Sequence, residues 1–120
     1  MSATYLHELR TRARRLVDEG RLDEAMRGYV VAADHADAIG VRVEGEQLRA
    51  RARQVVVYVW ARARGLDVSF DDVTPVYVPA NGLPIGPTRR FIVRAVDGDE
   101  LMVLVDPADR VRVSPRRRAR

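Results

Sequence analysis

Arginine residues at helical spacing around the one tryptophan are the side chains of this sequence best suited to chemistry. When successive residues are placed about 100° apart around a helix, three arginines and the tryptophan fall on one side. They are Arg49, Arg53, Trp60 and Arg64. Guanidinium groups bind phosphates and carboxylates, and an indole ring stacks on a base or anchors a protein contact. This pattern predicts a surface for nucleic acid or for an acidic protein partner. The alternative is that Trp60 packs against the rest of the protein and the arginines form a solvated helix face.

A second basic group closes the sequence. Four of the last five residues are arginines, namely Arg116, Arg117, Arg118 and Arg120. Each contact with a phosphate of duplex DNA adds about −0.9 to the slope of log affinity against log salt. Such a segment therefore predicts sequence-independent affinity for a polyanion, the alternative being a solubilising tail.

The sequence lacks several residue types on which most catalytic mechanisms depend. Its 120 residues include no Cys and two His, and all 21 basic residues are Arg. A thiolate nucleophile, a Cys-based zinc site, a lysine Schiff base and a phosphate-loop lysine are thereby excluded. Asp34 and Asp37 share a helix face, but His35 between them points elsewhere, so the three do not converge on a metal. We expect a protein that is not an enzyme and has no cofactor and no metal.

The use of Arg without Lys has two explanations. Lys codons are poor in G and C, so a high-GC genome depletes Lys and enriches Arg, Ala and Val. The other explanation is selection for the forked, planar chemistry of guanidinium. We expect a source among high-GC bacteria or their phages. The N-terminus has no signal-like pattern, and the longest apolar run, residues 55–61, is too short to span a membrane, which predicts a cytoplasmic or virion-associated protein.

The first part of the chain is expected to begin with a helix. Apolar residues recur at three- and four-residue steps from Leu6 to Val17, which gives one apolar face. Ser2 or Thr4 can serve as N-cap. Gly20 suits the left-handed position that follows a helix.

Two more helices are expected before residue 66. One starts near Leu22 and ends at Gly40, and the other covers about residues 44–64 and ends at Gly65. Residues 55–60 are of strand-favouring type, which leaves a strand as the alternative there. The helical spacing persists over several turns, and this favours the helix.

From Asp67 onward the composition changes to β-forming residues, and all six Pro lie in this part. The Asp97-Gly98 pair between apolar runs predicts a hairpin. The run 101–105 is apolar on both faces and predicts a central strand with one face on the helices. Strands are expected at residues 76–78, 90–96, 101–105 and 111–113.

These borders divide the chain into a helical region (1–66), a small antiparallel β region (67–113) and an Arg-rich tail (114–120). The expected fold class is therefore α+β, with three helices followed by a sheet of three to four strands. The regions hold 12 Arg and 9 acidic residues, 5 Arg and 8 acidic residues, and 4 Arg with no acidic residue, respectively. The positive charge thus resides in the helices and the tail.

The first two helices carry a pattern that resembles a single tetratricopeptide repeat over about residues 6–39. After Ala13 and Leu16, the residues that carry the pattern are Gly20, Leu22, Ala25, Tyr29 and Ala32. The closing Pro of the repeat is missing, with Asp37 near its place, and no second copy follows. The pattern is also similar to the three-helix microtubule-interacting-and-transport domain, and the strands loosely resemble a small SH3-like barrel.

The repeat resemblance implies a peptide-binding groove, although any packed helical hairpin needs small residues at these steps. The leading expectation is a non-catalytic binding or adaptor protein that contacts nucleic acid or an acidic partner through the arginine and tryptophan face and the tail. The alternatives are a structural assembly subunit, such as a phage head–tail or capsid accessory protein forming a homo-oligomer or larger assembly, and a peptide-binding adaptor. No membrane partner is expected.

Overall fold

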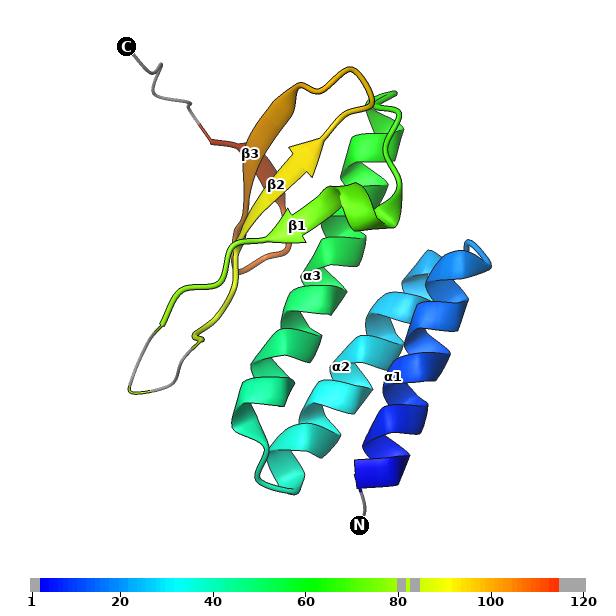
Figure 1. Ribbon diagram of the computed structural model, residues 1–120, viewed down its shortest axis with the longest axis vertical. Coiled ribbons are helices and arrows are strands. Elements are labelled where there is room, and N and C mark those ends of the chain that lie inside the picture. The colour runs from blue at the N-terminus through cyan, green and yellow to red at the C-terminus, as the bar shows by residue number, and fades with distance from the viewer. Residues whose placement is uncertain (1–2, 80–81, 83–84, 115–120) are drawn as a thin grey trace.

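The computed structural model describes residues 3–79, 82 and 85–114, and it has three helices followed by a four-stranded antiparallel sheet (Figure 1). The helices are α1 (Ala3–Asp18), α2 (Leu22–Ala38) and α3 (Arg42–Ala63). The α+β class is confirmed, and residues 55–60 are helical. The expected helix ends at Gly20 and Gly40 are also confirmed, because both glycines have positive φ, 76° and 86°. Thr4 lies inside the first turn of α1 and is not its N-cap, and Ser2 is outside the described residues.

A single 3₁₀ turn, η1 (Phe70–Asp72), leads from the helices into the sheet. The strands are β1 (Val73–Pro75), β2 (Arg90–Arg94), β3 (Glu100–Val105) and β4 (Val111–Val113), and they pair in chain order. β2 and β3 are therefore the two central strands, as expected for residues 101–105. The Asp97-Gly98 hairpin is confirmed, with the Asp97 carboxylate accepting a hydrogen bond from the backbone N–H of Asp99 at 3.0 Å.

The first strand differs from the expectation, because it covers residues 73–75 and not 76–78. Pro75 is the last residue of an edge strand, where its missing N–H costs no ladder bond. Val76 donates one more backbone hydrogen bond to the carbonyl of Arg90, at 2.9 Å. Arg90 is the first residue of β2, so residues 77 and 78 have no partner strand beside them.

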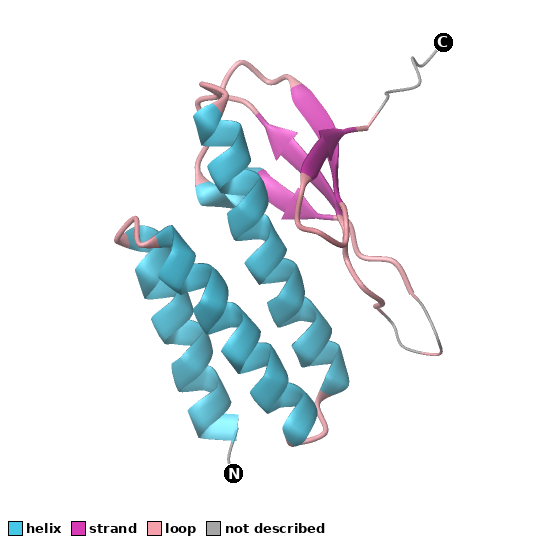
Figure 2. Ribbon diagram, turned by 180° about the vertical axis from the view of Figure 1, so that it is seen from behind, coloured by secondary structure: helices cyan, strands magenta, loops and turns pink. Residues whose placement is uncertain are grey.

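Helix α3 lies between the other two helices and the sheet (Figure 2), and two hydrophobic cores meet on it. The first lies between the three helices, where Ala25, Ala32 and Ala36 of α2 are fully buried and allow close helix approach. Tyr29 lies among them and is 3% exposed. The second core lies between the C-terminal half of α3 and the inner face of the sheet. Its buried members are Val57, Ala61, Val68, Val73, Phe91, Val93, Val103 and Val105.

Phe70 and its neighbours join the two cores. The Gln54 side chain of α3 is buried and donates a hydrogen bond to the carbonyl of Phe70 at 3.0 Å. Arg14 of α1 lies over the Phe70 ring and donates two hydrogen bonds to the carboxylate of Asp71, at 3.0 and 3.2 Å. These hydrogen bonds hold the pKa of Asp71 below its usual value. The β region is thereby tied to α1 as well as to α3.

Gly45 lies against the carboxylate of Asp37, which is held by its ion pair with Arg49, and replacing the glycine with Ala is expected to lower the free energy of unfolding by about 1–2 kcal/mol. A Cβ atom at this position would lie 2.3 Å from a carboxylate oxygen of Asp37. At an exposed helix position the same change stabilises a protein by up to about 1 kcal/mol. A loss of stability would therefore indicate that the added methyl group conflicts with Asp37. Urea denaturation of the variant measures it.

The matched experiment repeats the Gly45→Ala change in an Asp37→Ala background. Without the carboxylate the added methyl group meets only ordinary contacts, because the next protein atom outside Asp37 is the carbonyl oxygen of Ala33 at 3.4 Å. The destabilisation should then disappear. A Gly45→Ala protein as stable as the parent would contradict this account.

Candidate functional site

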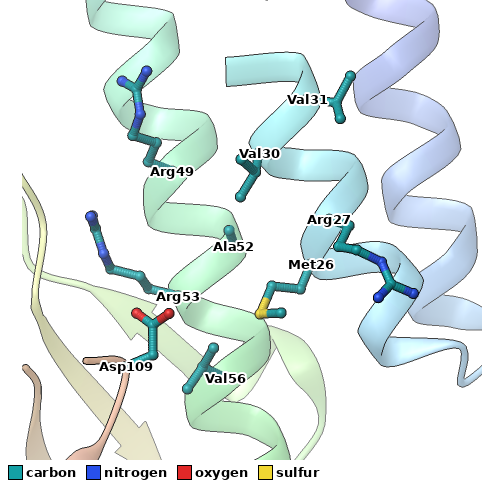
Figure 3. Close-up of a pocket in the computed structure, with 9 residues that line it drawn as sticks. All are labelled: Met26, Arg27, Val30, Val31, Arg49, Ala52, Arg53, Val56 and Asp109. Atoms are coloured by element: carbon teal, nitrogen blue, oxygen red, sulfur yellow. The ribbon is translucent and has the colours of Figure 1, made fainter. Parts of the chain in front are cut away.

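A groove with a volume of about 390 Å³ lies between α2 and α3 (Figure 3). The turn between β3 and β4 closes one end of it through Asp109. Its lining residues are Met26, Arg27, Val30 and Val31 of α2, Arg49, Ala52, Arg53 and Val56 of α3, and Asp109. We call this surface the α2–α3 groove.

The bottom of the α2–α3 groove is apolar and its borders carry charge. Met26, Val30, Ala52 and Val56 supply methyl, methylene and thioether groups, and Figure 3 shows them between the two helices. Val30 is 42% exposed, and Val31, on the outer side of α2, is 54% exposed. Val30 and Val31 therefore add exposed apolar surface at and beside the groove.

Arg49 lies in the groove wall, but acidic residues of the protein itself neutralise its charge. Its guanidinium forms ion pairs with Asp37, with Glu46 at 2.8 Å and with Asp34 at 3.6 Å. The hydrogen bond with Asp37 is the main cause that raises the pKa of Arg49 above its usual value. Asp34 and Asp37 share a helix face, as expected, and what they face is Arg49. This cluster ties the C-terminal part of α2 to α3.

Arg53, one turn further along α3, is in the opposite situation. Its guanidinium is partly buried and donates a hydrogen bond to the backbone carbonyl of Thr88 at 3.2 Å. It forms no ion pair with any residue that the structure describes. Burial lowers the pKa of Arg53 from its usual value, and the nearby charge of Arg89 lowers it further. The charge of Asp109, which lines the same groove, acts on Arg53 in the opposite direction, but the two form no ion pair. Because guanidinium stays protonated in proteins, the groove holds a positive charge that no ion pair within the described residues neutralises.

Trp60 and Arg64 come together at the C-terminal end of α3, apart from the groove. The guanidinium of Arg64 lies 4.7 Å from the centre of the indole ring. Trp60 is partly buried and packs against the second core. The four predicted residues of α3 therefore form two pairs, one in the α2–α3 groove and one beside the sheet. The predicted contacts of Arg116, Arg117, Arg118 and Arg120 lie outside the described residues.

The α2 wall of the groove was missed at the sequence level. A signal for it exists: Met26, Val30 and Val31 are apolar but fall beside the face of α2 that carries the buried alanines and Tyr29. An apolar surface wider than one packing face indicates a second contact. No sequence pattern indicates that Asp109 lines the groove, because only the tertiary structure brings it there.

In the described parts of the chain, no group of three or more His, Asp or Glu residues is placed to hold a metal ion. Among the helices that the structure describes, none has the length and apolar character to cross a membrane. The chain matches no known protein-family model, no curated protein and no solved structure, so the proposals for its function depend on these surfaces.

Proposed function

We propose that this protein is a non-catalytic binding protein that holds an acidic segment of a protein partner in the α2–α3 groove. The observation that carries the proposal is the partly buried guanidinium of Arg53, which forms no ion pair with an acidic residue that the structure describes; Asp109 acts on it only from a longer distance. A charge that has lost part of its water is costly until an opposite charge reaches it. A carboxylate of the partner would supply that charge through hydrogen bonds to the guanidinium.

The floor of the groove favours a protein partner over nucleic acid at this site. Met26, Val30 and Val56 present aliphatic and thioether groups, which match the apolar side of an amphipathic helix. A groove between two packed helices accepts the ridge of another helix, a shape that a nucleic-acid strand does not present. Arg27 lies on the α2 wall without an ion pair among the described residues, so cations stand on both sides of the apolar floor.

This arrangement favours a helix as the bound form of the partner. The groove follows two packed helices, and its apolar residues on α3, Ala52 and Val56, are four residues apart, the spacing that accepts the ridge of another helix. A partner that continues past Val56 along α3 would reach Trp60 with Arg64 over its ring. Arg49 has a positioning role in this proposal, because its ion pairs hold the two walls together.

The test uses a fluorescent helical peptide of about 15 residues, long enough to follow the groove, with Glu on one face and Leu on the other. Fluorescence anisotropy should detect binding that weakens as salt is added. Arg53→Met should reduce the affinity about tenfold or more, since hydrogen bonds to charged groups contribute about 1.5–3 kcal/mol. Val31→Glu should also reduce it.

The controls separate the site from overall charge. Arg12→Gln removes one exposed arginine of α1 and should leave the affinity unchanged. A peptide with Lys in place of Glu should not bind. Arg53→Met should stay folded, because the loss of the hydrogen bond to the Thr88 carbonyl is offset by removal of a desolvated charge. Equal binding of the acidic peptide by the parent and by Arg53→Met would overturn the proposal.

A further inference from the structure

The outer face of the sheet, the side turned away from the helices in Figures 1 and 2, carries its own pattern of residues. Because side chains alternate along a strand, the buried Phe91, Val93, Val103 and Val105 assign the remaining positions of β2 and β3 to the outer face. The strand register places these residues in three rows across the sheet. The rows are Thr74–Ile92–Met102, Arg90–Leu104–Arg112 and Arg94–Glu100.

The centre of the outer face is apolar. Ile92, Met102 and Leu104 are partly exposed, and they belong to neither hydrophobic core. They lie side by side on the two central strands, which are about 4.8 Å apart. The face therefore presents a small, flat aliphatic strip.

Positive charge flanks this strip. Arg90 and Arg112 stand on either side of Leu104, and neither guanidinium has a hydrogen bond or ion pair among the described residues. Strand spacing puts their backbones about 10 Å apart. Arg94 forms an ion pair with Glu100, at 2.6 Å.

The acidic residues of the β region lie elsewhere. Asp97 and Asp99 are in the turn between β2 and β3, and Asp106 and Asp109 are in the turn between β3 and β4. Glu100 is the one acidic residue within the four strands. A region whose net charge is negative thus has a locally positive outer face.

We propose that this outer face is a second binding surface, and that its ligand is single-stranded nucleic acid. Arg90 and Arg112 would contact phosphates, and the aliphatic strip of Ile92, Met102 and Leu104 would lie against unstacked bases and sugars. A duplex keeps its base faces covered, so it could use only the arginines.

Two other occupants are distinguished by charge and by experiment. A second copy of the chain docked on this face would bring two surfaces of net positive charge together, and like charges repel. An acidic protein helix would match the charge, so binding of the acidic helical peptide that is lost in Arg90→Gln, Arg112→Gln would overturn the proposal. Nucleic acid matches both the unpaired arginines and the apolar strip between them. The proposal is independent of the partner assigned to the α2–α3 groove.

The test measures binding of a fluorescent oligothymidylate of about 20 nucleotides over a range of salt concentrations. The double variant Arg90→Gln, Arg112→Gln should bind more weakly at low salt. Each phosphate contact of a single strand contributes about −0.7 to the slope of log affinity against log salt, so the slope should become less steep by about 1.4. Met102→Gln should weaken binding without changing the slope, because it removes an apolar contact only.

The matched control is Arg12→Gln, Arg15→Gln, which removes the same charge from exposed positions of α1. It should keep the parent slope. Equal losses in the two double variants would mean attraction by net charge alone and would overturn the proposal. So would a duplex that binds more tightly than the single strand, or binding abolished by removal of residues 115–120 but unaffected by changes at Arg90 and Arg112. Arg53→Met should leave oligonucleotide binding unchanged, so a failure at the groove is distinguishable from a failure here.

Discussion

Replacing Phe91 with Ala is expected to lower the free energy of unfolding by about 3–5 kcal/mol. Phe91 is fully buried at the centre of the second core. It lies on β2 directly opposite Val103 of β3 and Pro75 of β1. Removing the ring leaves a cavity between three strands and α3 that the rigid sheet cannot fill by collapsing. For a domain of this size that loss is a large fraction of the total stability.

Ile92 provides the matched control for Phe91. It is the next residue of the same strand, but its side chain is on the outer face and partly exposed. Ile92→Ala should therefore cost only about 1 kcal/mol. Urea denaturation followed by the fluorescence of Trp60, which packs against the same core, measures both variants. Similar losses at the two positions would contradict the assignment of inner and outer faces.

The second large effect is expected for Tyr29→Ala, which should cost about 3 kcal/mol. Tyr29 is 3% exposed among the three helices, and burial raises the pKa of its hydroxyl. Tyr29→Phe, which keeps the ring, should retain most of the stability. Val31→Ala, on the exposed side of the same helix, should change it little.

Tyr29→Ala also tests whether the two cores unfold together. Val55 of α3 packs in the first core and Val57 in the second, and a helix cannot keep one of these faces folded while the other is lost. Helix content from circular dichroism should therefore fall in the same transition as the fluorescence change of Trp60. A variant in which helix content falls before Trp60 responds would show that the helices and the sheet are separate cooperative units.

Much of the fold follows from local residue patterns. The three helices and their ends at Gly20 and Gly40 were predictable from periodicity and left-handed glycines, and the Asp97-Gly98 hairpin from turn chemistry. The first strand was misplaced because pairing depends on where the partner strand begins. Val76 donates its backbone hydrogen bond to Arg90, the first residue of β2. The two residues are far apart in the sequence, so local patterns do not reveal this pairing.

The candidate site was only half predictable, for a related reason. Spacing on one helix brought Arg49 and Arg53 together, and both line the groove. Spacing gave no means of telling their environments apart. Arg49 meets Asp34 and Asp37 of α2, whereas Arg53 meets a backbone carbonyl of the loop before β2. The second wall of the groove belongs to α2, whose packing against α3 sets the register between them.

The sequence by itself determined the element types, the lack of thiol and lysine chemistry, and the surplus of arginine. The tertiary structure decided which arginines remain without an acidic partner. Arg53 at the α2–α3 groove, and Arg90 with Arg112 on the outer face, have no ion pair in the described part of the chain, whereas Arg14, Arg49 and Arg94 do. The physical reason is that the charge of a guanidinium is a property of the residue. Its neutralisation depends on contacts between elements, as between α1 and η1 or between α2 and α3.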